Sequence, residues 1–279
     1  MDKNIIISNS RDFEKKKKIF KEQGVNKLHI ISDFDRTLTK SFTNGKCISS
    51  MSQLYHGDYL GSNYNKKAKD LFDKYYPIEI NSDIPLVEKR KIMKKWWKEH
   101  ELLLIEYGLN LKHIKKLVIE GNLEFRVGSK EFFDLTHERK IPLIIFSSSG
   151  VGDSISLYFD KIKKNYDNIH IISNSFNYDK KGYAISFKEP IIHLLNKGEI
   201  ALKGLPIMKK LKDKKNVILL GDNLGDLDMV EGFKYDNIIK IGFLNQYDEN
   251  QLKHYKENFD VVILNDLDMF FVNNLVREF

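Results

Sequence analysis

The fold is decided by Leu28-His29-Ile30-Ile31-Ser32-Asp33-Phe34-Asp35-Arg36-Thr37-Leu38-Thr39, a stretch near the N-terminus. Its first residues form a short apolar run, which predicts a buried β-strand. Two carboxylates, Asp33 and Asp35, follow where this strand ends. In an extended chain such side chains point the same way, so both can be aimed at one point. Unpaired buried charge is unfavourable, and a cation and a phosphate group between the acids would resolve that.

Strands and helices alternate along most of the chain. Apolar runs predict strands over 28–32, 142–146, 169–172, 217–220, 238–241 and 261–264, and a hairpin over 176–187. Helical patterns cover 11–23, 66–76 (ended by Pro77), 82–108, 111–119, 131–139, 153–166, 191–196 and 205–211. Such alternation predicts an α/β protein with a doubly wound, mostly parallel sheet that is covered by helices on both faces.

The helices between the first two long strands predict a separate unit. Residues 41–62 are polar and glycine-containing and predict loops and turns, and the remainder up to about residue 127 is helical. We expect a core domain made of residues 1–44 and 128–279, and a helical cap domain of residues 45–127 inserted after the first core strand. The cap would lie above the carboxyl ends of the strands, where open α/β sheets bind ligands.

Composition excludes several classes of protein. The sequence has 279 residues and a single cysteine, Cys47, so it can form no intrachain disulfide. It lacks the roughly 18 consecutive apolar residues that a membrane span needs, and Met1 to Asn4 do not begin a signal peptide. The net charge is +7, but the lysines are interleaved with acids and no nucleic-acid-binding module is recognised. We therefore expect a cytoplasmic monomer with no nucleic-acid or membrane partner.

Polar residues follow three of the predicted strands. Asp33 and Asp35 follow the first, Ser147 and a glycine-rich turn follow the strand over 142–146, and Asp222 follows the strand over 217–220, with Asp226 four residues later. An aspartate after a strand is often only a helix cap. The joint occurrence at one expected edge of the sheet favours a shared site.

The residue types at this edge suit phosphoryl transfer. Carboxylates of Asp33, Asp35 and Asp222 around one point favour a hard cation such as Mg²⁺, which would lower the repulsion between an anionic nucleophile and a phosphate. Asp33 can attack phosphorus and form an aspartyl-phosphate. Asp35 can protonate the departing oxygen and later deprotonate water. A hydroxyl, backbone N–H groups and a lysine would bind the other phosphate oxygens.

The segment 33–39 resembles the Asp-x-Asp-x-Thr signature of the haloacid dehalogenase superfamily of phosphatases. Within that superfamily the chain is similar to the cytosolic pyrimidine 5′-nucleotidases, the type III cytosolic 5′-nucleotidase family. The similarity extends over about residues 10–275. The stretches that carry it are 74–79, 146–153, 187–188, 193–197, 218–226 and 241–245.

The resemblance implies roles for the residues of the core. Asp33 would be the nucleophile and a metal ligand, and Asp35 the acid/base, which would bind the metal through its backbone carbonyl. Asp222 would complete the Mg²⁺ site with support from Asp226. Lys197 matches a lysine that contacts both phosphate and nucleophile; by composition alone it would be a surface helix lysine.

The resemblance also implies a substrate pocket under the cap. Glu79 matches a glutamate that recognises the nucleoside. The segment 146–153 is one residue longer than the family pattern, so either Ser147, which we favour, or Ser148 supplies the phosphate-binding hydroxyl. Trp97 matches an aromatic position at which tryptophan accompanies acceptance of 7-methylguanosine monophosphate as well as pyrimidines, and stacking of a cationic purine on indole is favourable. A Trp pair is equally suited to the cap core, and His100 either narrows the pocket or faces solvent.

We therefore expect a Mg²⁺-dependent 5′-nucleotidase that hydrolyses UMP and CMP to nucleoside and phosphate through an aspartyl-phosphate on Asp33. Phosphate transfer to another nucleoside would be a side reaction, because a sugar hydroxyl can compete with water. One alternative is a 5′-nucleotidase that prefers 7-methylguanosine monophosphate, or another phosphatase of the superfamily. A more distant alternative is a non-enzymatic nucleic-acid-binding protein, which would show salt-sensitive retention of nucleic acid.

Overall fold

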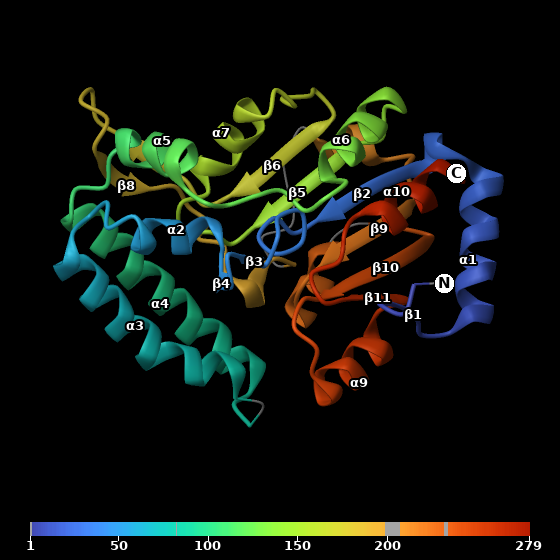
Figure 1. Ribbon diagram of the computed structural model, residues 1–279, viewed down its shortest axis with the longest axis horizontal. Coiled ribbons are helices and arrows are strands. Elements are labelled where there is room, and N and C mark those ends of the chain that lie inside the picture. The colour runs from blue at the N-terminus through green and yellow to red at the C-terminus, as the bar shows by residue number, and fades with distance from the viewer. Residues whose placement is uncertain (1, 82, 199–206, 232–233) are drawn as a thin grey trace.

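A seven-stranded sheet forms the centre of the molecule (Figure 1). The computed structural model describes residues 2–81, 83–198, 207–231 and 234–279. The strand order is β1–β11–β10–β9–β2–β5–β6. The bounds are β1 (Ile5–Ile7), β2 (Leu28–Ser32), β5 (Leu143–Ser147), β6 (Ile169–Ser173), β9 (Asn216–Gly221), β10 (Asn237–Leu244) and β11 (Val261–Leu264).

The sheet is doubly wound, as predicted. From the central strand β2 the chain proceeds to β5 and β6 on one side, and then returns to β9, β10 and β11 on the other. All of these neighbours pair in parallel, and β1 alone joins the edge antiparallel to β11. The winding changes direction between β2 and β9. Open α/β sheets bind ligands outside the carboxyl ends of the strands at such a point.

Both faces of the central strands are buried. Ile30 and Leu220 belong to the large hydrophobic cluster on one face, whereas Ile31 and Leu219 belong to a second cluster on the other. Side chains alternate between the faces of a strand, so a strand buried on both sides reads as a continuous apolar run. This is why β2, β5 and β9 could be recognised from the sequence.

Helices cover both faces of the sheet. They are α1 (Ser10–Gln23), α6 (Ser129–Glu138), α7 (Asp153–Lys161), α8 (Ile207–Leu211), α9 (Glu249–Asn258) and α10 (Phe270–Arg277). Buried side chains of α1, α6, α7 and α10 join the cluster that contains Ile30. Those of α8 join the cluster on the opposite face, and α9 packs against β10 and β11.

A group of helices lies to one side of the sheet (Figure 1). It comprises α2 (Ser50–His56), α3 (Ser62–Ile80), α4 (Leu86–Glu106) and α5 (Leu111–Glu120). The long helices α3 and α4 pack against each other, and α5 packs against α7 of the sheet layer. The other described strands form two hairpins, β3 (Phe42–Thr43) with β4 (Lys46–Cys47) and β7 (Phe176–Tyr178) with β8 (Ala184–Phe187). Short 3₁₀ helices cover Val25–Lys27, Leu194–Asn196 and Leu224–Val230.

Several element boundaries differ from the prediction. Residues 41–62 contain the helix α2, which begins after a capping box formed by Ser49 and Ser52. Pro77 lies inside α3 and does not end it; because it is in the last turn, it removes a single backbone hydrogen bond. The helix after β5 ends at Lys161, because Lys163 adopts a left-handed backbone conformation (φ 57°).

Other elements were shorter than expected or were missed. The helix predicted over 191–196 is a single 3₁₀ turn at Leu194–Asn196. The edge strand β1 and the helices α9 and α10 were not predicted. Residue 82 of the expected helix start and residues 205–206 of the expected helix over 205–211 lie outside the described residues. Across the described ranges, no helix has both the length and the apolar character required to cross a bilayer.

His100 holds three helices of the lateral group together. Its ring lies on α4, and Nε2 is 3.2 Å from Tyr55 Oη of α2 and 3.0 Å from Tyr64 Oη of α3. The side chain is buried, so the expectation that it faces solvent is wrong. Burial lowers the pKa of His100 to about 4.

This pKa predicts a loss of stability in acid. The folded-state pKa of His100 is below the ordinary value, so the unfolded chain binds the proton first as the pH falls. The contribution of the neutral ring is complete above about pH 6.5 and is lost as the pH falls toward 4. At pH 4.5 the loss of stability amounts to about 2.5 kcal/mol. Urea titrations should therefore show that the free energy of unfolding of His100→Gln falls less between pH 7 and 4.5 than that of the wild type. The exposed His254, changed to Gln, is the control; identical pH dependence in His100→Gln and wild type would contradict the prediction.

Candidate active site

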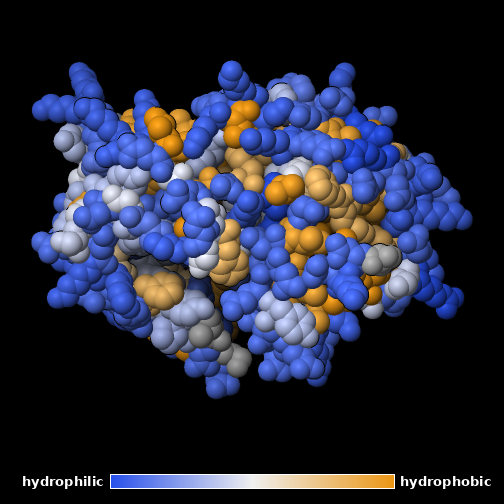
Figure 2. All heavy atoms as spheres, in the orientation of Figure 1, coloured by the Kyte–Doolittle hydropathy of each residue, from blue (hydrophilic) through white to orange (hydrophobic). Residues whose placement is uncertain are grey.

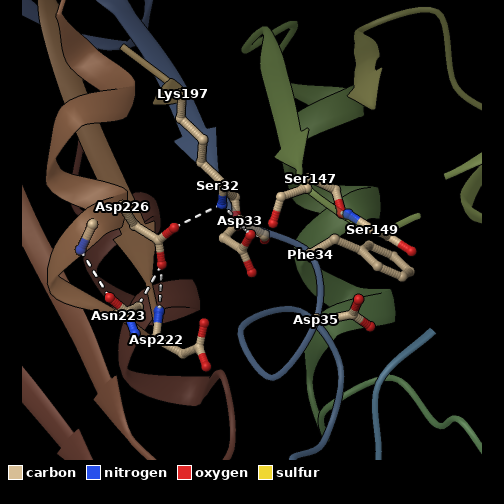
Figure 3. A network of polar contacts seen from close by, with 12 residues as sticks. Ser32, Asp33, Phe34, Asp35, Ser147, Ser149, Lys197, Asp222, Asn223 and Asp226 are labelled. Carbon is tan, nitrogen blue, oxygen red and sulfur yellow. Dashed lines mark hydrogen bonds and ion pairs between the residues drawn. The ribbon is translucent and has the colours of Figure 1, made fainter. Parts of the chain in front are cut away.

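Three carboxylates meet at the carboxyl edge of the sheet (Figure 3). Asp33 follows β2, Asp222 follows β9, and Asp226 lies in the 3₁₀ helix Leu224–Val230. One oxygen from each lies within 4.8 Å of the others. Because β2 and β9 are neighbouring parallel strands, their ends bring Asp33 and Asp222 together from distant parts of the chain. The structure thus brings Asp33 and Asp222 together, and their role as metal ligands stays a prediction.

Lys197 binds two of these carboxylates. Its Nζ lies 2.5 Å from Asp33 Oδ1 and 2.7 Å from Asp226 Oδ1, and all three side chains are buried. Lys197 directly follows the 3₁₀ turn Leu194–Asn196, whose start is capped by His193. Burial alone would lower the pKa of Lys197, but Asp226 and Asp33 together raise it above its ordinary value. The lysine is therefore charged.

The second oxygen of Asp226 fixes the backbone that carries Asp222. Asp226 Oδ2 accepts hydrogen bonds from the N–H groups of Asp222, at 3.1 Å, and Asn223, at 3.0 Å. Asn223 in turn caps the 3₁₀ helix through its side chain. Asp226 thus connects Lys197 to the loop of Asp222, a geometry that matches the expected supporting role.

The cluster has an excess of negative charge. Burial raises the pKa of Asp33 well above its usual range, and the negative charges of Asp226 and Asp222 raise it further, although Lys197 opposes the shift. Burial and Asp226 likewise raise the pKa of Asp222 to about 7. Arg36 lies nearby and opposes the shift at Asp222. The nearby cations do not balance the three carboxylates, and carboxylate oxygens are the ligands that a divalent cation such as Mg²⁺ prefers.

The side chain of Asp35 does not join this cluster. Its Oδ1 accepts the N–H of Ser50 at 2.6 Å and its Oδ2 accepts the Ser50 hydroxyl at 2.5 Å. The expectation that Asp33 and Asp35 aim their carboxylates at one metal is therefore wrong. Extended geometry ends at β2, because the chain turns immediately: Leu38 donates to the carbonyl of Phe34, and Arg36 has a left-handed conformation (φ 63°). Ligation through the Asp35 backbone carbonyl stays a prediction.

Ser147 lies beside Asp33. It is the last residue of β5, the neighbour of β2, and its side chain extends toward Asp33 in Figure 3. Its Oγ accepts the N–H of Ser149 at 3.2 Å, so the hydroxyl proton remains available for a phosphate oxygen. Ser148 follows it, with its backbone carbonyl bound by Asn174. This geometry supports the preference for Ser147 over Ser148, and phosphate binding itself stays a prediction.

Helix α4 touches the segment that carries Lys197. Arg90 donates from Nε to the carbonyl of Leu195 at 2.6 Å. Trp97 packs with Trp96 and Leu195 in one aromatic cluster. Trp96 is the buried centre of that cluster, whereas Trp97 is only partly buried, with an Nε1 that finds no hydrogen-bond partner among the described residues. Of the Trp pair, Trp96 therefore belongs to the packed core between the helices, and Trp97 lies at the partly exposed edge of that core.

Glu79 lies next to the same cluster. The preceding residue, Ile78, packs against the aromatic cluster. Burial raises the pKa of the Glu79 carboxyl. Within the described part of the chain, the polar contact of this residue is made by its backbone carbonyl, which accepts Lys89 Nζ at 3.1 Å. The ammonium of Lys89 also opposes the rise in the pKa of the Glu79 carboxyl.

Arg126 was missed by the sequence reasoning. Its fully buried guanidinium donates to the carbonyls of Thr37 (2.8 Å), Leu267 (2.6 Å) and Arg36, and forms an ion pair with Asp266 at 3.0 Å. It fixes the loop that follows Asp33. An arginine in a short connecting segment gives no local signal of such a role, because its partners lie in distant parts of the sequence.

The face of the molecule seen in Figure 2 is mostly hydrophilic, with apolar side chains in scattered groups. The fold and site define a phosphatase of the haloacid dehalogenase type. A family model described as pyrimidine 5′-nucleotidase (UMPH-1) matches residues 36–279, and the chain belongs to that family. It is therefore a 5′-nucleotidase, a phosphoric monoester hydrolase.

Individual relatives agree with this assignment. A Gallus gallus 7-methylguanosine phosphate-specific 5′-nucleotidase is 38% identical over 259 residues, which cover 92% of this chain and 89% of the relative. The Homo sapiens protein of the same name is 37% identical over 91% of this chain and 85% of its own. The crystal structure of cytosolic 5′-nucleotidase IIIB bound to cytidine superposes with a TM-score of 0.90 at 26% identity, covering 100% of this chain and 94% of that one.

The bridge formed by Lys197 predicts a strong effect on stability. Lys197→Met leaves Asp33 and Asp226 buried without their cation, which should lower the free energy of unfolding by about 3–5 kcal/mol. Mg²⁺ would replace part of the missing charge, so it should raise the melting temperature of the variant more than that of the wild type. Thermal and urea unfolding with and without Mg²⁺ measure both effects. The exposed Lys209, changed to Met, is the control, and a Lys197→Met protein as stable as wild type would refute the bridge.

Proposed function

We propose that this protein is a Mg²⁺-dependent 5′-nucleotidase that hydrolyses UMP and CMP to nucleoside and inorganic phosphate. The observation that carries the proposal is the cluster of Asp33, Asp222 and Asp226 at the switch point of the sheet, in which the buried Lys197 binds Asp33 and Asp226. The family's description and the cytidine in the solved relative support a pyrimidine substrate. We further propose that the chain is a cytoplasmic monomer that acts on free nucleotides, without nucleic-acid or membrane partners.

In the proposed reaction Asp33 is the nucleophile. Its carboxylate oxygen bonds to phosphorus while the bond from phosphorus to O5′ of the nucleotide breaks, and Asp35 transfers a proton to O5′. Asp35 then removes a proton from water, which attacks the aspartyl-phosphate and releases phosphate. Lys197 orients Asp33 and, with Ser147, binds phosphoryl oxygens.

The metal site would be formed by Asp33, Asp222 and the backbone carbonyl of Asp35. When bound there, Mg²⁺ supplies positive charge that offsets the repulsion between carboxylate and phosphate. Asp226 would support the site through the backbone of Asp222.

The helices over 45–127 would form a cap domain that encloses the base, with residues 1–44 and 128–279 as the catalytic core. The contact of Arg90 with Leu195 supports a lid that closes over the segment of Lys197. In this arrangement Glu79 and Trp97 of the cap recognise the nucleoside, and closure excludes water from the reacting phosphate.

A second candidate substrate is 7-methylguanosine 5′-monophosphate. Trp97 is partly buried in the aromatic cluster, and Glu79 directly follows Ile78, which packs in the same cluster. An indole and a carboxyl together suit a cationic purine. The names of the Gallus gallus and Homo sapiens relatives support the same substrate. Methylation at N7 gives the ring a positive charge that pyrimidines lack, so the two candidates can be separated by measurement.

Phosphate release tests the reaction. Wild-type protein should release phosphate from UMP or CMP with Mg²⁺ and lose this activity when EDTA removes the metal. Asp33→Asn should abolish turnover, because an amide cannot form the acyl phosphate, while the melting temperature stays at or above the wild-type value since buried like charge is removed. Acid-quenched wild-type protein should also carry label from ³²P-UMP. Full activity of Asp33→Asn would remove the proposed nucleophile.

A substrate panel tests base recognition. We expect kcat/KM values for UMP, CMP and 7-methyl-GMP above that for AMP. Glu79→Gln should lower them by about 10- to 100-fold, as for loss of a charged hydrogen bond. Trp97→Phe should reduce use of 7-methyl-GMP more than that of UMP, because indole is the better partner for a cation. Glu88→Gln, an exposed change on the same helix α4 as Trp97, is the control. Unchanged selectivity in both cap variants would exclude this pocket.

A further inference from the structure

Asp35 is held by a residue outside the signature segment. Both of its carboxylate oxygens are bound by Ser50, the first residue of α2, through the backbone N–H at 2.6 Å and the hydroxyl at 2.5 Å. The Ser50 side chain is fully buried. Two convergent hydrogen bonds from one residue fix both the position and the plane of a carboxylate.

A second serine extends this contact. Ser50 Oγ lies 2.7 Å from Ser149 Oγ, and Ser149 Oγ also accepts the N–H of Val151 at 3.2 Å. Ser50 has one hydroxyl proton and two oxygen neighbours, Asp35 Oδ2 and Ser149 Oγ. When Asp35 is ionised this proton goes to the carboxylate, and the Ser149 hydroxyl then donates to Ser50. The result is a directed chain, Ser149 to Ser50 to Asp35, in which each hydroxyl strengthens the next hydrogen bond.

The chain joins three separate segments at one carboxylate. Asp35 belongs to the loop after β2, Ser50 opens the first helix of the lateral group, and Ser149 lies in the segment after β5 that is one residue longer than the family pattern. The adjacent Ser49 is instead the N-cap of α2, where its side chain accepts the N–H of Ser52 and does not contact Asp35. Of the two neighbouring serines, Ser49 therefore caps the helix and Ser50 binds the carboxylate of Asp35.

We propose that Ser50 is a positioning residue that orients Asp35 for proton transfer to the leaving oxygen, and that Ser149 supports it through the hydroxyl chain. This inference rests on the proposed function, because it assigns Asp35 the role of acid/base. It adds that the first helix of the cap holds the acid/base in place, so that chemistry on the sheet depends on a residue of the cap.

The dependence on the leaving group distinguishes this role from a merely structural one. The 5′-oxygen of a nucleoside needs a proton to depart, whereas p-nitrophenolate leaves without one. The ratio kcat/KM reports the steps up to release of the leaving group, so it isolates the proton donation. Ser50→Ala should lower kcat/KM for UMP by about 10- to 100-fold, as for impaired general-acid catalysis, and leave kcat/KM for p-nitrophenyl phosphate within about twofold of wild type.

Three further variants complete the design. Ser50→Thr keeps the hydroxyl and should restore activity toward UMP. Ser149→Ala should cause a smaller loss with the same selectivity for UMP. Ser49→Ala weakens the helix cap alone and should change both substrates equally or not at all.

Each contrary result has a defined meaning. The assignment would be overturned if Ser50→Ala lowered kcat/KM equally for UMP and p-nitrophenyl phosphate. It would also be overturned if Ser49→Ala lowered kcat/KM for UMP selectively, because a general loss of rigidity at the start of α2 would then explain both variants. Faster hydrolysis of UMP by Ser50→Ala would also overturn it, since Ser50 would then hold Asp35 away from the substrate. A wild-type protein that releases no phosphate would instead refute the proposed function.

Discussion

The ammonium of Lys197 is the interaction on which the site depends. Asp33 and Asp226 are buried beside each other, and neither could remain charged there without a cation at hydrogen-bond distance. Through Asp226 the same cation also fixes the backbone of Asp222. One buried charge therefore connects the end of β2, the end of β9 and the 3₁₀ turn before Lys197. The remaining negative charge is what makes the edge of the sheet suitable for a metal and a phosphate.

The sequence was most informative for strands that are buried on both faces of the sheet. Strands β2, β5 and β9 are mostly apolar because both of their faces pack against helices, and their order of appearance predicts the doubly wound sheet. Edge elements carry a weaker pattern. Strand β1 is a run of only three isoleucines, all partly buried, which is too short to stand out in the sequence. Helix α9 is mostly polar and buries little more than Tyr255. Helix α2 was missed because its serines, which form the cap, also favour turns.

The site could be predicted as far as residue spacing reflects geometry. The meeting of Asp33 with Asp222 follows from parallel strands that end at one edge, which is a property of the fold class. The orientation of Asp35 does not follow, because it depends on the turn after Phe34 and on Ser50, which lies 15 residues further along the chain. Lys197 and Glu79 were identified only by resemblance. The partners of Lys197 are 29 and 164 residues away, and no local periodicity encodes such contacts.

In the proposed function, residues at the edge of the sheet carry out phosphoryl transfer, and residues on the lateral helices recognise the base. This separation explains how the same reaction can be combined with different nucleotide specificities. Asp33 and Asp222, the proposed nucleophile and metal ligands, directly follow buried strands, where packing keeps their geometry constant. The base, in contrast, would meet Trp97 and Glu79 on helices of the lateral group. Among the described residues, the polar contacts of this group with the edge include those of Arg90 with Leu195 and of Ser50 with Asp35. Substitutions in the aromatic cluster can therefore change which base is accepted without disturbing phosphoryl transfer. The Ser50 contact sets a limit to this freedom, because a change that displaces α2 would also displace Asp35.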